Sequence, residues 1–500
     1  MGPRVAAVGG KMFNGSLAKI EHNSRRILKC CAQITGLAAP LQLICFTAMA
    51  GGFEIPDNGA QSVSRGSAFT VKADDLTALA HNPGGLMRGK GLRILYSHNV
   101  VHSPAKFTRA ATSLATQSNP AGTDPNATVE NQTPWFGLGG MLVAANDFGM
   151  ENWCFAVGIY GPSAAGHQEW PISGGQRYML TKLDVLLVYG SAAVAYGVRD
   201  KFGIGLTLQV AYQPKTELSL VIDGQTGTDL SPYYASNDVE ATIKLNAPPT
   251  LTAIAGGWLR LSDNWELGAS GRILPVRMNG TGDIALQKTP TGAQFTPAQL
   301  AVTGSAARLL LVLPPTAKIG LRYRGMEGTV ERFDVEMDFV YEAWSMLKDY
   351  KVELDGKINL FAAVDAPDVT IAKRWKDTLS LRLGGTYNLA AMPLSLSAGT
   401  YYETGAVPNN YTNLDFMSFD RLGVGGGVRF AVATDIDLTL AYNHIFQADR
   451  TVTEEFGKVL QQRPISPCPQ GCDGYDGVVA NAGKFQSSFD IISASAQIHF

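Results

Sequence analysis

The sequence lacks a long apolar run beyond residue 50, and it lacks a strong charge of either sign. No stretch there reaches the roughly 20 apolar residues that a membrane-spanning helix needs. The 41 Lys and Arg are balanced by 43 Asp and Glu, which is not the basic excess of a nucleic-acid-binding protein. The sequence has no Gly-x-Ser-x-Gly motif, and its seven histidines form no triad pattern with serine and an acid. These absences argue against a helical membrane protein, a nucleic-acid partner and a serine hydrolase.

Cysteine is also scarce, and its placement bears on the compartment. Three of the six cysteines, Cys30, Cys31 and Cys45, precede residue 51. Cys468 and Cys472 stand in Cys-Pro-Gln-Gly-Cys, and we expect them to close a small disulfide loop in an oxidising compartment. A zinc site is the alternative, but no second Cys/His pair accompanies this one, so we expect no metal.

Residues 1–50 have the layout of a secretory signal peptide. A basic segment, 25–29, precedes an apolar run, 34–50, that ends in Ala48-Met49-Ala50. This combination predicts cleavage before Gly51. Pro40 and Gln42 interrupt the run, which is too short for a secure membrane helix.

The end of the chain alternates strictly between apolar and polar residues. The even positions from Ile492 to Phe500 are apolar, and the odd positions between them are polar. The closing strand of a membrane β-barrel needs such a pattern, with lipid outside and a polar lumen inside. The last strand of a soluble antiparallel sheet would alternate in the same way.

Many other segments alternate like this, and the gaps between them are short and long in turn. The gaps at 199–201 and 262–264 are tight, whereas those at 215–247, 279–314 and 346–375 are long. Outer-membrane barrels have this layout, with turns in the periplasm and loops outside. We therefore predict an all-β fold, a transmembrane antiparallel β-barrel of about 14 strands over residues 91–500. The expected strands are 91–102, 134–145, 152–161, 182–198, 202–214, 248–261, 265–278, 315–325, 332–345, 376–388, 394–403, 420–432, 436–447 and 487–500.

Within these strands, the charged residues occupy alternate positions, which all face the same side of the sheet. Four inward positions of 333–342 are acidic: Asp334, Glu336, Asp338 and Glu342. A charge facing lipid at the bilayer midplane would cost about 2–4 kcal/mol, so these side chains are expected in the lumen. If Tyr323 pairs with Phe333, Arg322 lies beside Asp334 and Lys318 beside Asp338. We then expect a ladder of ion pairs across the inner wall.

Residues 51–90 do not alternate, and we predict that they form a small hatch that plugs the lumen. The segment begins with Gly51 and Phe53 and is rich in glycine. Asp74 and Asp75 are expected to cap a short helix over 76–81, and Asn82-Pro83-Gly84 to end it. A loose leader in the periplasm is the alternative.

Several short motifs occur together in a specific order: Ala73-Asp74-Asp75, Asn82-Pro83-Gly84-Gly85-Leu86, Leu313-Pro314-Pro315, Tyr341-Glu342-Ala343-Trp344-Ser345, Trp375-Lys376-Asp377, and Thr404-Gly405-Ala406-Val407-Pro408 with Phe419-Asp420-Arg421. With them, the mature chain resembles the outer-membrane long-chain fatty-acid transporters, the FadL/TodX family. Gly84 departs from the family's usual Asn-Pro-Ala-Gly-Leu. The resemblance implies a plugged fourteen-stranded barrel that carries hydrophobic molecules inward without energy input.

The resemblance also implies a lateral opening at a kink in the third strand. Gly158, Gly161 and Pro162 lie in or just after that strand, and glycine and proline permit such a break. The alternative is that Gly161-Pro162 merely starts the following loop.

A hydrophobic cargo needs an apolar groove in which to leave water. Phe295 and Leu300 in 279–314, Phe361 in 346–375, and Trp344 are candidates to line it. Lys376 and Arg421 have inward parity near the loop ends of their strands, and either could select a carboxylate.

The expected location is the outer membrane of a Gram-negative cell. The expected partners are fatty acids or hydrocarbons, outer-membrane lipid and lipopolysaccharide, and the barrel-assembly machinery. We expect a monomer without a cofactor. A barrel enzyme acting on lipids and a general diffusion porin are the alternatives.

The disulfide is directly testable. Alkylation of the unfolded mature protein should label two more thiols after reduction than before it, because Cys468 and Cys472 are then released. Mass spectrometry counts the labels, and Cys468→Ser is the control. Equal labelling before and after reduction would mean that the loop is open.

Overall fold

In the computed structural model, the described residues are 58–111, 126–161, 166–223, 238–290, 295–358, 364–365, 368–462 and 478–500, all within the compact unit formed by residues 48–500. The expected signal peptide, 1–50, lies outside these residues. So do Gly51, Phe53, Pro162, Phe361, Cys468 and Cys472. No helix within the described ranges is long and apolar enough to cross a bilayer.

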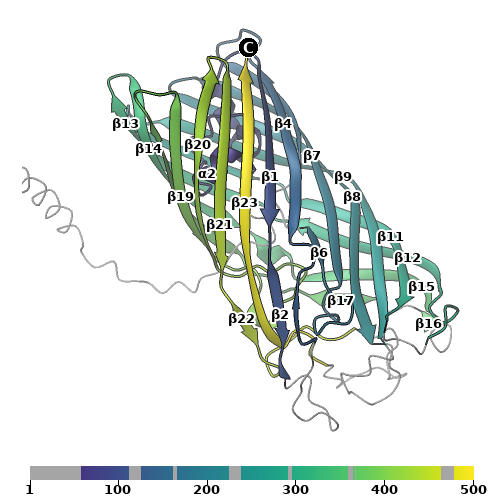
Figure 1. Ribbon diagram of the computed structural model, residues 1–500. Helices are drawn as coiled ribbons and strands as arrows, with labels where there is room; N and C mark the ends of the chain where they lie inside the picture. Colours follow the sequence, from purple (N-terminus) through teal and green to yellow (C-terminus); the bar gives the residue numbers. More distant parts are fainter. Residues whose placement is uncertain are drawn as a thin grey trace, which may run out of the picture. The chain divides into compact units, whose positions relative to one another are not determined.

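Fourteen antiparallel strands close into a barrel (Figure 1). Each wall strand pairs with the next one along the chain, and the last returns to the first, with Arg93 opposite His499. The predicted strand number and closure are confirmed. The wall consists of β1 (Arg93–His102), β4 (Trp135–Asn146), β5 (Trp153–Tyr160), β7 (Lys182–Val198), β8 (Phe202–Asp223), β9 (Asp238–Arg260), β10 (Trp265–Arg272), β13 (Thr316–Glu327), β14 (Val330–Glu342), β18 (Thr378–Asn388), β19 (Leu394–Glu403), β20 (Arg421–Ala433), β21 (Ile436–Gln447) and β23 (Gly483–His499).

The facing of the wall side chains follows the alternation in the sequence. On β14, the odd positions from Phe333 to Tyr341 are exposed on the outer face, whereas Asp334, Glu336 and Asp338 are buried inside. β18 and β21 alternate in the same way, with Leu381 and Leu440 outside. A large apolar outer surface is what lipid requires, and the acids avoid it.

Both ends of the barrel wall, the start of β1 and the end of β23, lie at the end with the short turns. At the other end, the loop end, shorter strands extend or cover the wall. They are β2 (Ala105–Arg109), β3 (Thr128–Glu130), β6 (His167–Glu169), β11 (Val276–Lys288), β12 (Val302–Leu313), β15 (Asp349–Ile358), β16 (Val364–Asp365), β17 (Val369–Ala372) and β22 (Arg450–Val452), with the 3-10 turns η5 (Trp344–Met346) and η6 (Asn409–Tyr411).

Most of the long gaps expected between strands therefore contain strands, and the longest of these strands lie in three of the gaps. β8 and β9 run on into 215–247, β11 and β12 occupy much of 279–314, and β15 with β17 lies in 346–375. In these extensions the polarity of the two faces is reversed. On β11, Met278 and Ile284 are buried inside, while Arg277 and Asn279 face out. This reversal breaks the alternation expected of a membrane strand, so the sequence predicted these segments to be loops.

The register between β13 and β14 differs from the expected one by two residues. Tyr323 lies opposite Val335, and Arg324, not Arg322, lies opposite Asp334. Lys318 lies opposite Val340 and so is not beside Asp338. A shift of two residues preserves the facing of every side chain, which is why the lumen position of the acids was right while the pair list was wrong.

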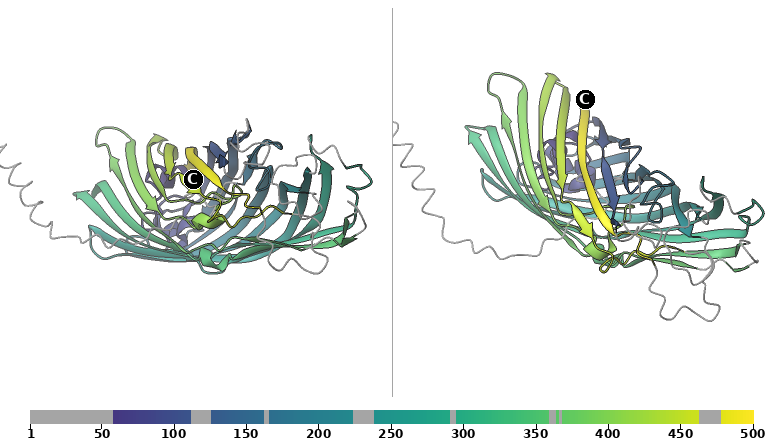
Figure 2. Two further views of the ribbon diagram at one scale, coloured as in Figure 1. Left: turned by 90° about the horizontal axis from the view of Figure 1, so that it is seen from below. Right: turned by 60° about the horizontal axis from the view of Figure 1, so that its bottom comes forward.

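Residues 58–90 lie inside the barrel. They form α2 (Ala60–Ser64), α3 (Ala78–His81) and η2 (Pro83–Arg88), and nearly all of their side chains are buried. The views in Figure 2 show these purple segments within the curve of the strands. The expected helix over 76–81 is shorter than predicted, with Thr77 as its N-cap residue and no side-chain cap. Asp75 instead accepts the Thr77 amide proton at 2.9 Å and so holds the preceding turn.

Candidate functional site

Two carboxylates on the inner face of β14 bind the backbone of the luminal segment 58–90. Asp338 accepts the amide protons of Phe69 and Thr70, each at 2.9 Å. Glu336 accepts those of Val71 and Lys72, at 2.6 and 3.0 Å. Both carboxylates are fully buried, and the four hydrogen bonds engage three of their four oxygens, which would otherwise be costly to bury. Asp338 Oδ1 has no hydrogen-bond partner among the described residues.

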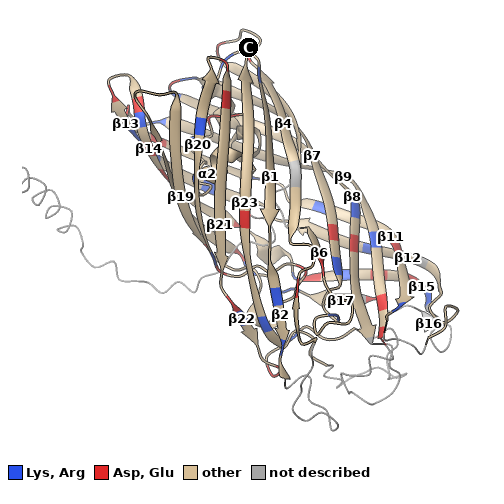
Figure 3. Ribbon diagram, viewed as in Figure 1, with Lys and Arg blue, Asp and Glu red and all other residues tan. Residues whose placement is uncertain are grey.

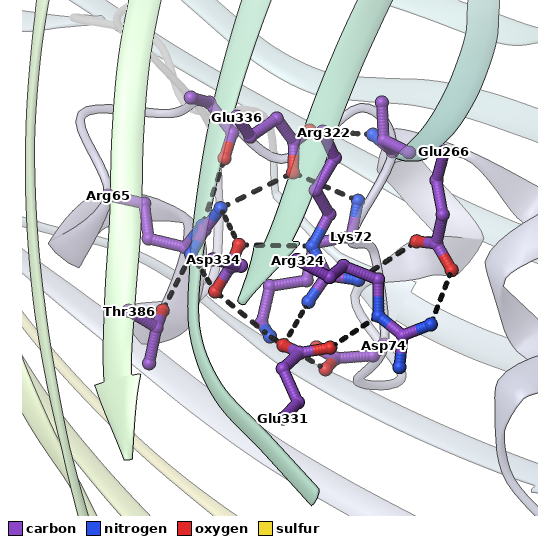
Figure 4. Close-up of polar contacts among 12 residues, drawn as sticks. Arg65, Lys72, Asp74, Glu266, Arg322, Arg324, Glu331, Asp334, Glu336 and Thr386 are labelled. Atoms are coloured by element: carbon purple, nitrogen blue, oxygen red, sulfur yellow. Dashed lines mark hydrogen bonds and ion pairs between the residues drawn. The ribbon is translucent and has the colours of Figure 1, made fainter. Parts of the chain in front are cut away.

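A network of buried ion pairs surrounds this contact (Figure 4). Arg65 Nη2 lies 2.7 Å from Asp334 Oδ2, and Arg65 Nη1 donates to Thr386 at 2.6 Å. Arg322 reaches Asp334 at 3.0 Å and Glu266 on β10 at 2.9 Å. Asp334 is thus shared between a luminal and a wall arginine, and the expected wall ladder is in part a joint between the wall and the luminal segment.

Strands β8 and β9 also hold the segment through polar side chains. Trp258 Nε1 donates to the Gly84 carbonyl at 3.0 Å, and Thr207 Oγ donates to the Leu79 carbonyl at 2.8 Å. Asn82 Nδ2 donates to the Gly257 carbonyl at 3.0 Å and Asn82 Oδ1 accepts from Gly84, so Asn82 does end α3 and starts the Pro83 turn. A Cβ atom at Gly84 would lie 2.5 Å from the Gly203 oxygen, which explains why alanine is absent there.

The wall is interrupted between β4 and β5. β4 pairs with β1 as far as Trp135, but its ladder with β5 runs only from Asn146–Phe155 to Leu142–Ile159. β5 ends at Tyr160, and β6 takes its place beside β7 only from His167 on. The β4 residues 135–141 therefore have no described strand on this side.

Two of the residues expected at a lateral opening, Gly158 and Gly161, lie at this end of β5. Gly158 is still paired, opposite Ser191 of β7, whereas Gly161 lies just past the last pair of β5. Asn58 Nδ2 donates to the Gly161 carbonyl at 2.8 Å, and His81 Nε2 lies 2.7 Å from the Asn58 carbonyl oxygen. The start of the luminal segment thus touches the edge of the break.

One continuous apolar cluster connects this break with the loop end. It includes Met141 and Leu187 beside the break, Leu79 of the luminal segment, and Trp344 and Trp375 at the loop end. The two tryptophan rings meet at 5.2 Å, and Trp375 meets Phe416 at 6.2 Å. Trp344 was predicted as a lining residue, whereas Trp375 and Phe416 were not.

Phe295 and Leu300 are buried in a separate cluster with the loop-side parts of β8, β9 and β11. Its members are Leu220, Ile222, Val239, Ala241, Leu286, Phe295 and Leu300. These two candidates are therefore brought together with each other but not with Trp344.

The candidate cations differ from expectation. Arg421 faces inward and is buried, but it is paired with Glu403, with Nε at 2.7 Å. Lys376 precedes β18 and is exposed, unlike its expected inward position. The buried lysine of this rim is Lys373, which is paired with Asp415 and lies 4.8 Å from the Tyr350 ring centre.

Arg450 of β22 is a loop-end cation that sequence reasoning missed. Its guanidinium lies 4.3 Å from the centre of the Phe419 ring and donates to the Val407 carbonyl at 2.5 Å. Burial lowers the pKa of Arg450 to about 10, and the Asp420 carboxylate offsets this only in part. Among the described residues, no carboxylate lies within ion-pair distance of it, although it remains a cation at neutral pH. β22 is only three residues long, so no alternation marked it.

A family model of outer-membrane transport proteins, described as OMPP1/FadL/TodX, matches residues 41–474. The chain belongs to this family. It is therefore an outer-membrane transport barrel for hydrophobic compounds, not an enzyme.

Solved structures agree with the fold. A Pseudomonas aeruginosa FadL homologue matches with a TM-score of 0.69 at 16% identity, covering 90% of this chain and 100% of that one. The P. putida toluene transporter TodX matches with a TM-score of 0.63 at 14% identity, covering 89% and 99%. The Ralstonia pickettii toluene transporter TbuX matches with a TM-score of 0.60 at 13% identity, covering 90% and 100%. No curated protein sequence matches the chain.

The contact of this FadL/TodX-family barrel with its luminal segment can be tested at Arg65. Arg65→Met should lower the free energy of unfolding by about 3–5 kcal/mol, because it leaves Asp334 and Glu336 buried with less compensation. It should also raise ion conductance across planar bilayers if the segment loosens. Arg332→Met, which removes a half-exposed pair with Glu327, is the control and should change both by little. Unchanged conductance and stability in Arg65→Met would contradict this role of the pair.

Proposed function

We propose that the protein takes up long-chain fatty acids or similar hydrophobic compounds by passive diffusion and releases them sideways into the outer membrane. The observation that carries this proposal is the combination of an occupied lumen with an interrupted wall. Residues 58–90 stand in the direct route through the barrel, and the β4–β5 ladder ends beside them.

The reversed polarity of the loop end supports the first step. Above the bilayer, the strand extensions bury their apolar faces inside, so a hydrophobic molecule can leave water there. Burial contributes about 25 cal/mol per Å² of apolar surface, which for a long chain far exceeds thermal energy. The aromatic cluster of Trp344, Trp375 and Phe416 is the proposed binding region.

The continuous apolar cluster supports the second step. It reaches Met141 and Leu187, which flank the break in the wall. A cargo moving along it stays in an apolar environment and ends beside the bilayer core. Residues 58–90, with residues 51–57 ahead of them, are then the hatch that prevents direct passage to the periplasm.

The path can be tested with a polar group at the break. Met141→Asn and Leu187→Asn should each reduce import of a labelled long-chain substrate about tenfold, because an unpaired amide costs roughly 1–3 kcal/mol in an apolar site. Val340→Asn is the matched control, since Val340 is equally buried on the inner face of β14, away from the break. Cells lacking the gene, complemented with each variant, give the import rate. Equal import by all three variants would overturn the lateral path.

Two further measurements separate the alternatives. Purified protein should hydrolyse no phospholipid, and liposomes that contain it should not become permeable to small sugars. Lipid hydrolysis would favour a barrel enzyme, and sugar permeation a general diffusion porin.

Arg450 gives a test of cargo charge. If the cargo is a carboxylate, Arg450→Gln should reduce its import about tenfold, because a hydrogen bond to a charged group contributes roughly 1.5–3 kcal/mol. Import of a neutral hydrocarbon of equal length should not change. Lys484→Gln, a half-exposed residue at the same end, is the control. A similar loss for both cargoes would show that Arg450 serves the structure and not the selection of a carboxylate.

A further inference from the structure

A cavity of about 510 Å³ lies on the outer face of the barrel at the loop end. Its lining comes from β11, β12, η5 and the start of β15, where these extensions leave the wall. Arg308 and Leu310 line it and alternate along β12 with the inward-facing Leu309 and Leu311. The mouth of the cavity therefore opens away from the lumen. Its floor includes Leu309 and Leu347, which also belong to the apolar cluster of the proposed cargo path.

The outer surface changes from apolar to charged at this level. On β8, the exposed Leu208, Val210 and Tyr212 give way to Lys215, which pairs with Asp184 of β7. On the next strand, Lys244 lies 4.0 Å from Glu217. Figure 3 shows blue and red bands on the loop-side parts of β8 and β11, at the end away from the C-terminus. A charged belt directly beyond a lipid-facing band marks the head-group layer of the outer leaflet.

The cavity has an excess of basic groups at its rim. Arg308, Lys348 and Lys351 line it, together with two acids, Asp349 and Glu353. Both acids already have basic neighbours, because Arg308 lies 3.7 Å from Glu353 and Arg374 lies 3.5 Å from Asp349. Lys348 and Lys351 are exposed and pair with no carboxylate in the described part of the chain. Two lysines are thus available to an external anion.

Apart from Asn279 and Thr281, the rest of the lining is apolar. Leu310 and Met346 are 39% and 43% exposed, although neither lies in the lipid-facing band of a wall strand. Val312 lies beside them. A ligand that fits this surface carries anionic groups on one side and hydrocarbon on the other.

We propose that this cavity binds the phosphorylated sugar head of an outer-leaflet glycolipid, the lipid A part of lipopolysaccharide. Its phosphates would lie against Lys348, Lys351 and Arg308, and the first part of an acyl chain against Leu310 and Met346. The site lies at head-group level, its free charge is positive, and its apolar part faces the bilayer. An outer-membrane phosphoglycolipid meets all three conditions. The basic residues of this site lie outside the proposed cargo path.

The test uses the full mature protein in detergent and measures bound lipid by native mass spectrometry. Diphosphoryl lipid A should bind the wild type at least about tenfold more tightly than the variant Arg308→Gln/Lys348→Gln/Lys351→Gln, because each base near an anionic lipid contributes about 1 kcal/mol. Lys106→Gln/Lys458→Gln/Lys484→Gln removes three exposed bases elsewhere at the loop end and should bind like the wild type. Met346→Gln keeps the charge and should weaken binding several-fold.

Two further probes distinguish the source of the phosphate. Lipid A without phosphates should bind the wild type no more tightly than diphosphoryl lipid A binds the triple variant. Inorganic phosphate at millimolar concentration should not displace diphosphoryl lipid A. Three outcomes would each overturn the proposal. Diphosphoryl lipid A could bind the wild type and the triple variant equally, phosphate-free lipid A could bind the wild type as tightly as diphosphoryl lipid A does, or inorganic phosphate could displace diphosphoryl lipid A fully. Import of a hydrophobic cargo by the triple variant should stay at the wild-type rate, which separates this site from the proposed function.

Discussion

The structure depends on the hydrogen bonds and ion pairs between the β14 carboxylates and the luminal segment. Asp338 and Glu336 are buried acids that would be prohibitively costly on the lipid face and costly in an empty apolar lumen. Four backbone amides from Phe69 to Lys72 bind them, and the guanidinium of Arg65 pairs with Glu336. The wall strand and the segment inside it therefore each complete the polar interactions of the other, and a change in either leaves a buried group unpaired.

The hydrogen bonds that hold residues 58–90 in the lumen have a consequence for transport. Because residues 58–90 are held by β14 and also by Trp258 and Thr207, a movement that cleared the lumen would break many hydrogen bonds at once. At the β4–β5 break, by contrast, the wall ladder is already absent beyond Leu142 and Ile159. Opening there costs no strand pairing. This difference supports the proposed sideways release.

The sequence predicted the wall strands well, because lipid imposes a strict rule on parity. That rule predicts that Asp334, Glu336 and Asp338 face inward, but it does not identify their ion-pair partners. The rule fixes the pairing register only to within multiples of two residues, and the β13–β14 register was missed by two. Arg65 was not predicted as a partner, since no local pattern connects it with a strand about 270 residues later. Lys373 was missed in favour of Lys376 for a similar reason: it lies in an irregular segment before β18, where parity has no meaning.

The extensions beyond the bilayer show where the parity rule ends. Within the membrane, the outer face of a strand must be apolar and its inner face can be polar. Beyond the membrane, water surrounds the outside of the barrel and the apolar faces turn inward. On β11, for example, Met278 faces inward and Arg277 faces out. The same change in solvent that obscured β11, β12 and β15 in the sequence creates the two surfaces that matter for function. It produces an apolar interior at the loop end, which a hydrophobic cargo can reach from water. It also produces a charged outer rim, where Lys348 and Lys351 line the cavity proposed to bind a phosphorylated glycolipid.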